Sequence, residues 1–113
     1  MSRDYRAYLA DILFSIDKIE RYTRRKTFLQ FKTDELVQDA VVRNLEIIGE
    51  ATKKLPGKRK QSEPDIEWDK IAGLRNILAH EYFGVDNEIV WQIVKKKLPQ
   101  LRKAVQSITG HNP

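Results

Sequence analysis

The sequence contains no cysteine, and its other scarce residues limit the chemistry that it can perform. Without thiols, the chain forms no disulfide and offers no thiolate ligands for zinc. It has only two histidines, His80 and His111, and the second stands close to the C-terminus. Histidine is the side chain best suited to acid–base chemistry near neutral pH, so such chemistry centres on His80.

The chain also lacks any long apolar run. Within residues 1–6 the charges alternate in sign, from Arg3 to Asp4 to Arg6, and they lead into no long apolar run. We therefore expect neither a signal peptide nor a membrane span, and we expect a cytoplasmic location. At 113 residues the chain is long enough for one core. The prediction is a single domain over residues 1–113, with a frayed tail over 110–113.

Basic side chains are abundant, because 21 lysines and arginines against 16 acidic residues give a formal net charge of +5. This balance favours an anionic partner, of which nucleic acid is the obvious one, although a merely soluble basic domain explains it equally well. The densest cluster combines Lys53 and Lys54 with Lys58, Arg59 and Lys60. Charge runs of this kind are usually solvated faces rather than dedicated RNA contacts.

Apolar residues recur at helical spacing in four segments, and no segment indicates a strand. Helices are expected over residues 3–25, 34–55 with Thr33 as N-cap, 68–80, and from Asp86 or Asn87 to about 108. A connector separates the first two helices, and we expect its Phe28 and Phe31 to lie under the bundle. A polar loop over 58–65 separates the second helix from the third. Pro99 predicts a kink in the last helix. The expected fold is an all-α antiparallel bundle of four to five helices.

The segment from Arg75 to Tyr82 holds the strongest functional signal. On a helix, Arg75 has only apolar neighbours three and four residues away, so it has no local ion-pair partner. Its guanidinium needs an anion from elsewhere, either a carboxylate such as Glu46 or Glu50, or a bound phosphate. A guanidinium suits phosphate because it donates two parallel charge-assisted hydrogen bonds.

His80 follows Arg75 by five residues, which is not the same helical face. The two side chains converge only if the helix ends near His80, as Phe83 and Gly84 predict. Asn76 lies four residues before His80 and could orient the ring, whereas the Tyr82 hydroxyl could reach the same phosphate or attack an activated nucleotide. Plainer interpretations stay open. His80 could cap a helix or lie in the core, and the Tyr82 ring could simply pack on the bundle.

Arg75-x4-His80-x-Tyr82, with Asn76 after the arginine, resembles the signature of HEPN-domain ribonucleases of the HepT type, which are toxins of bacterial and archaeal toxin–antitoxin pairs. Residues 43–50 resemble the second-helix signature of that family, and residues 65–74 resemble its approach to the catalytic helix. The similarity extends from Asp4 to about Leu101. Glu67 departs from the pattern, since many relatives carry proline there.

The resemblance implies a HEPN-type bundle with a short catalytic third helix. It makes Arg75 and His80 the catalytic pair and Tyr82 the motif tyrosine. A minimal nucleotidyltransferase, the cognate antitoxin, would transfer AMP from ATP to Tyr82 and silence the toxin. Similar proteins form two-fold homodimers whose motifs face a shared cleft.

Metal catalysis is the less attractive chemistry, because the chain has no His-x3-His pair and Glu46 and Glu50 form only a generic acidic pair. We expect metal-independent cleavage of RNA without a cofactor, with Asn76 and Glu50 in supporting roles. Two alternatives remain open. The chain could be a non-catalytic module that binds RNA or nucleotides, or a structural dimeric partner of a nucleotidyltransferase.

Overall fold

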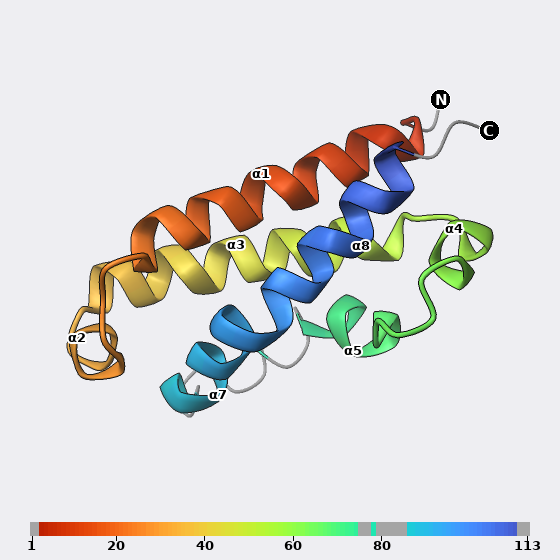
Figure 1. Cartoon of the computed structure of the whole chain (residues 1–113). Helices are drawn as coiled ribbons and strands as arrows, with labels where there is room; N and C mark the ends of the chain where they lie inside the picture. Colours follow the sequence, from red (N-terminus) through yellow and green to blue (C-terminus); the bar gives the residue numbers. More distant parts are fainter. Residues whose placement is uncertain (1–2, 75–77, 79–85, 111–113) are drawn as a thin grey trace.

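The computed structural model describes residues 3–74, 78 and 86–110. Over these ranges every regular element is helical, which confirms the predicted all-α class. Three long helices, α1 (Tyr5–Thr23), α3 (Glu35–Lys53) and α8 (Leu98–Gly110), form the body of the bundle, and α1 runs antiparallel to both of the others (Figure 1). The molecule measures 45 × 28 × 26 Å along its principal axes.

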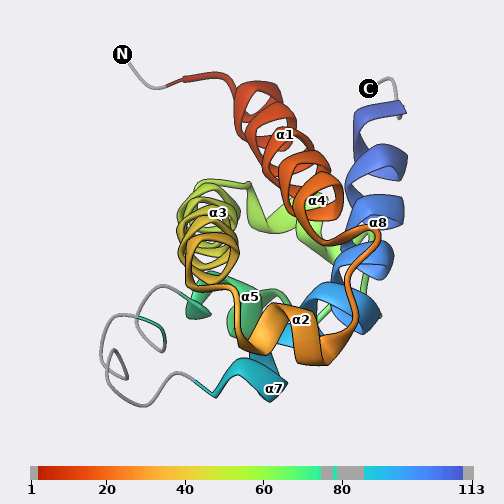
Figure 2. The ribbon, with the colours of Figure 1, turned by 90° about the vertical axis from the view of Figure 1, so that its left-hand side faces the viewer.

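Short helices connect and cover the long ones: α2 (Phe28–Lys32), α4 (Gly57–Gln61), α5 (Trp68–Ala72) and α7 (Asn87–Gln92). Figure 2, which looks along the bundle, shows α2 and α7 together at one end and α5 beside α3. None of the helices in the described ranges has the length and apolar character needed to cross a membrane.

The core is built from the apolar positions that the helical spacing picks out. These side chains are all at most 4% exposed: Leu9, Ile12, Ile16, Ile19, Val41, Leu45, Ile48, Leu55, Val90, Val94, Leu98, Leu101, Val105 and Ile108. Phe31 is fully buried and Phe28 packs partly against the core, as predicted for the connector. Periodicity predicts these residues well because burial of one stripe is what stabilises each long helix.

Two connectors contain helices that the sequence did not indicate. Residues 28–32 form α2, held by a capping box in which the Thr27 side chain accepts from Gln30 N and the Gln30 side chain accepts from Thr27 N. The expected loop over 58–65 begins instead with α4. Both are single turns of five residues, too short to display an apolar period.

The predicted N-cap of the second long helix was wrong by one residue. Asp34 caps α3, because its carboxylate accepts from Val37 N at 3.1 Å. Thr33 ends α2 instead, and its hydroxyl lies 3.2 Å from Leu29 O and 3.3 Å from Gln30 O. A hydroxyl engaged with the preceding helix is not available to cap the following one.

The irregularity predicted at Pro99 takes the form of a π-helical turn, η1 (Ile93–Lys97), between α7 and α8. Leu98 N donates to Ile93 O, five residues back. Proline cannot donate to the carbonyl four residues before it, and the wider turn accommodates that loss without ending the helix. Asp86 caps α7 as predicted, by accepting from Glu88 N at 2.9 Å.

Candidate functional site

The predicted motif side chains of Arg75, Asn76, His80 and Tyr82 lie outside the described residues, as do the expected helix end and the turn at Phe83 and Gly84. Their catalytic roles therefore stay predictions. The structure does describe the frame that precedes and follows them: α5, Leu74, Leu78 and the start of α7. Leu74 and Leu78 are 7% and 5% exposed and belong to the hydrophobic core.

The frame is fixed on its N-terminal side by Trp68. The indole of this first residue of α5 is 9% exposed. Its Nε1 donates to Lys60 O and to Glu63 O, both at 3.0 Å. These bonds tie the end of α4 and the connector to α5, so the approach to the motif is held by a buried aromatic ring with a satisfied polar group.

Glu67, the N-cap residue of α5, links that helix to η1. Its carboxylate lies 2.7 Å from Lys70 Nζ and 3.4 Å from Lys97 Nζ. The hydrogen bond from Lys70, its charge and the contact with Lys97 hold the pKa of Glu67 below its ordinary value. An acidic side chain at this position therefore ties the start of α5 to η1.

On the C-terminal side, α7 is anchored through Trp91. Its ring lies 5.1 Å from that of Phe31 and 6.3 Å from that of Phe28, measured between centroids. Through this aromatic cluster α7 packs on α2, and Val90, which is 2% exposed, adds a core contact. Both flanks of the motif are thus joined to the same core.

Glu50 is the one predicted site residue whose side chain the structure describes. It lies on α3, partly exposed, with Oε1 at 3.5 Å from Lys53 Nζ. With Tyr8 of α1 and Glu46 it lines a groove of about 290 Å³ between α1 and α3. Glu46 lies 3.9 Å from Arg43. The suggested pairing of Arg75 with Glu46 or Glu50 stays a prediction.

Asn44, in the segment that resembles the family's second-helix signature, is 6% exposed. Its Nδ2 donates to Ala40 O at 2.8 Å, while its Oδ1 has no hydrogen-bond partner among residues 3–74, 78 and 86–110. Thr52 Oγ1, on the same helix and fully buried, is likewise without one in that part of the chain. Residue spacing alone does not reveal such orphaned acceptors.

Within the described ranges, no group of three or more histidine, aspartate or glutamate side chains is placed to hold a metal ion. The two histidines lie outside those ranges.

Comparison with known proteins gives a consistent result. The family model described as "Ribonuclease HepT-like" matches residues 12–108. A Thermococcus cleftensis protein named "Probable ribonuclease HepT" is 44% identical over 102 residues, which cover 90% of this chain and 93% of that protein. A Methanocaldococcus jannaschii "Putative RNase" is 38% identical, over 94% of this chain and 97% of its own length.

A second Methanocaldococcus jannaschii protein, named "Gamma-glutamylcyclotransferase and putative RNase", is 44% identical over 108 residues. These cover 96% of this chain but 49% of that protein, so the chain spans about half of its length. No solved structure matches the chain significantly.

Proposed function

Because the chain belongs to the HepT-like ribonuclease family, we propose that it cleaves RNA internally and without a metal ion, using Arg75 and His80. One observation carries this: the family match covers residues 12–108 and so includes the whole Arg75-to-Tyr82 motif. The family and the names of the relatives support an endoribonuclease activity. The net charge of +5 suits a polyanionic substrate.

The proposed reaction is transfer of the RNA phosphoryl group to the neighbouring 2′-oxygen. A base takes the 2′-hydroxyl proton, the 2′-oxygen bonds to phosphorus, and the bond from phosphorus to the 5′-oxygen breaks. An acid returns a proton to that leaving oxygen. The products are a 2′,3′-cyclic phosphate and a free 5′-hydroxyl. His80 acts as base or acid, and Arg75 stabilises the extra negative charge on the phosphorane.

One chain offers one suitably placed histidine for two proton transfers. A two-fold homodimer would present two copies of His80 and of Arg75 across one cleft, so that one imidazole can act as base and the other as acid. In this arrangement Asn76 fixes the geometry and Tyr82 positions the substrate. Glu50, which lies on α3, helps to complete this cleft.

The biological role that we propose is that of the toxin in a toxin–antitoxin pair. The antitoxin, a minimal nucleotidyltransferase, would join the Tyr82 oxygen to the α-phosphorus of ATP and release pyrophosphate. The resulting AMP group places bulk and negative charge beside Arg75 and His80. Both properties oppose the entry of a second anion, so RNA would be excluded.

The test is to incubate the purified protein with single-stranded RNA in excess EDTA. We expect cleavage, with 2′,3′-cyclic phosphate at the new ends. An RNA carrying one 2′-deoxyribose at a mapped cleavage site serves as the matched control, and it should resist cleavage at that site alone. Salt-dependent binding of RNA without any turnover would contradict the enzyme and favour the non-catalytic binding module instead.

A further inference from the structure

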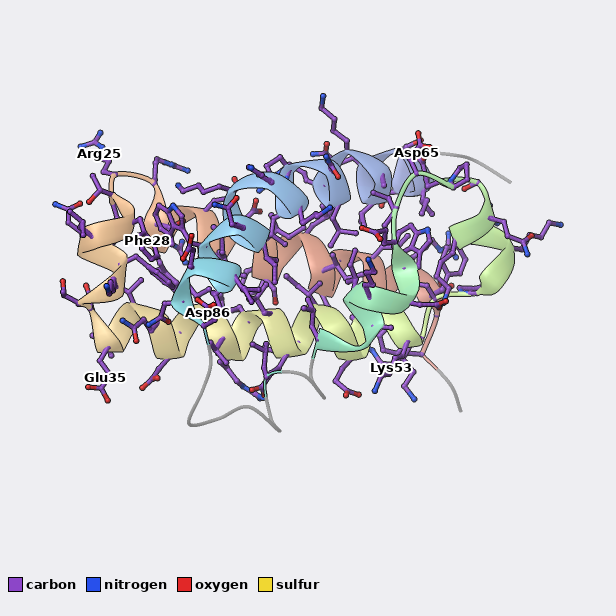
Figure 3. All side chains as sticks on the ribbon, turned by 90° about the horizontal axis from the view of Figure 1, so that it is seen from below. Arg25, Phe28, Glu35, Lys53, Asp65 and Asp86 are labelled. Carbon is purple, nitrogen blue, oxygen red and sulfur yellow. The ribbon has the colours of Figure 1, made fainter. Side chains whose placement is uncertain are left out.

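A groove at the corner where α1 meets α2, here called the corner groove, has an unusual charge. It is a cavity of about 750 Å³. Its lining consists of Arg21, Tyr22, Arg24, Arg25, Lys26, Gln30, Thr33, Asp34 and Glu35. Four cations thus face two carboxylates. Figure 3 shows Arg25 and Glu35 at this end of the molecule, with the Arg25 side chain directed away from the bundle.

The cations of the corner groove are only partly neutralised. Lys26 lies 3.3 Å from Asp34. Arg24 and Arg25 are exposed, and neither forms a salt bridge or a side-chain hydrogen bond with any described residue. The Arg21 guanidinium stands 5.7 Å from the centroid of the Tyr22 ring. The net positive charge of the groove is therefore open to an external anion.

Three other grooves of the described surface provide a comparison. The groove between α1 and α3 is lined by three cations and three carboxylates. The two grooves beside α5 are each lined by two of either sign. Only the corner groove, of these four, carries an excess of positive charge.

The fold itself does not require this excess. A helix C-terminus attracts cations, and α1 ends at Thr23. Lys95 of η1 already serves that end, with Nζ at 3.5 Å from Thr23 O. The same Nζ lies 4.6 Å from the centroid of the Trp91 ring. Arg24 and Arg25 are therefore not needed to interact with the carboxyl end of α1.

We propose that the corner groove binds single-stranded RNA outside the catalytic motif, with its arginines on backbone phosphates and Tyr22 as a stacking surface for a base. A guanidinium fork matches a phosphate with two parallel hydrogen bonds. An aromatic ring beside a basic track is the usual arrangement for binding single strands without reading their sequence. The choice of RNA as the polyanion rests on the proposed function.

Binding at two places predicts a particular kinetic effect. A strand that reaches both the motif and the corner groove is held more tightly, while the reacting phosphodiester meets the same groups. The corner groove should therefore lower KM for long RNA and leave kcat unchanged. An oligonucleotide too short to reach the groove should be cleaved equally well without it.

The experiment compares Arg24→Gln/Arg25→Gln with Lys96→Gln/Lys103→Gln, an equal loss of charge at exposed positions of η1 and α8. The substrate is a single-stranded RNA long enough to span the 45 Å axis. For the arginine variant, KM should rise about three- to tenfold at unchanged kcat. The slope of log affinity against log salt, measured with a 2′-deoxy-substituted strand that is not cleaved, should fall by about 1.4 for two phosphates. The lysine variant should match wild type.

Equal behaviour of the two variants, whether both lose affinity or neither does, would overturn the corner groove as a site, because net charge alone would then explain binding. Tyr22→Leu should also weaken binding, whereas Tyr22→Phe should not. Failure of the proposed ribonuclease would be visible separately, as absence of cleavage by the wild-type protein, since affinity and salt slope are measured without turnover.

Discussion

At the residue scale, the most informative signal is the pair Arg75 and His80, which sequence spacing and the types of the neighbouring residues indicate together. Arg75 has no acidic residue within one helical turn, and His80 is the one histidine within the predicted helices. The corner groove is different, because Arg21, Arg24, Arg25 and Lys26 look in sequence like an ordinary basic helix end. Only the folded structure shows that Lys95 of η1 already interacts with the carboxyl end of α1 at Thr23, so that Arg24 and Arg25 are not needed there.

Tyr82 provides a prediction at this scale. Coexpression with the cognate nucleotidyltransferase should add one or more AMP units, detectable as mass increments on the tryptic peptide that contains Tyr82. The modified protein should lose RNA cleavage, because phosphate and adenosine occupy the space beside Arg75 and His80. Tyr82→Phe is the matched control, since it removes only the acceptor oxygen and should stay unmodified.

AMP found exclusively on another tyrosine, such as Tyr5, Tyr8 or Tyr22, would contradict the role of Tyr82 as acceptor. Cleavage that persists at full rate in stoichiometrically modified protein would contradict the silencing mechanism instead.

At the element scale, the long helices could be predicted because each buries one regular apolar stripe. The short helices α2 and α4 could not be predicted, because a helix of a single turn is stabilised by its caps and by contacts with residues remote in sequence. The Gln38 side chain illustrates this: from α3 its Nε2 donates to Phe31 O and Lys32 O, both at 2.8 Å, and so completes the end of α2. The one-residue error at Thr33 has the same origin.

Helix caps also predict how stability depends on pH. Asp4 caps α1 by accepting from Arg6 N at 2.9 Å. The hydrogen bond from the Arg6 side chain, with that from its backbone, lowers the pKa of Asp4 from 3.8 to about 2. The ionised carboxylate therefore stabilises the folded state above about pH 4, and this stabilisation is lost as the pH falls toward 2.

Asp4→Asn keeps an acceptor for the cap but removes the titrating group. Urea unfolding at several pH values between about 4 and 2 should show a smaller loss of unfolding free energy than in wild type. Asp39→Asn is the control, since Asp39 is an exposed carboxylate of α3 with no ion pair among the described residues. Parallel pH profiles for wild type and Asp4→Asn would refute the linkage.

At the scale of the whole molecule, the bundle fixes the two helices on either side of the motif. α5 and α7 flank the motif, and Trp68 and Trp91 fasten them to the one core. Apolar spacing predicted this architecture, and the motif predicted the family. Distribution of charge over the folded surface could not be predicted, because Lys95 and Thr23 are 72 positions apart in the chain.

The decisive measurement is the single-turnover rate of RNA cleavage in EDTA for His80→Ala beside His111→Ala. Loss of a general acid or base should slow His80→Ala by about 10²- to 10⁴-fold, while His111→Ala, which removes the only other histidine, should cleave at the wild-type rate. Circular dichroism of both variants should report an unchanged helical fold. Full activity in folded His80→Ala, or an equal loss in both variants, would contradict His80 as the group that moves the proton.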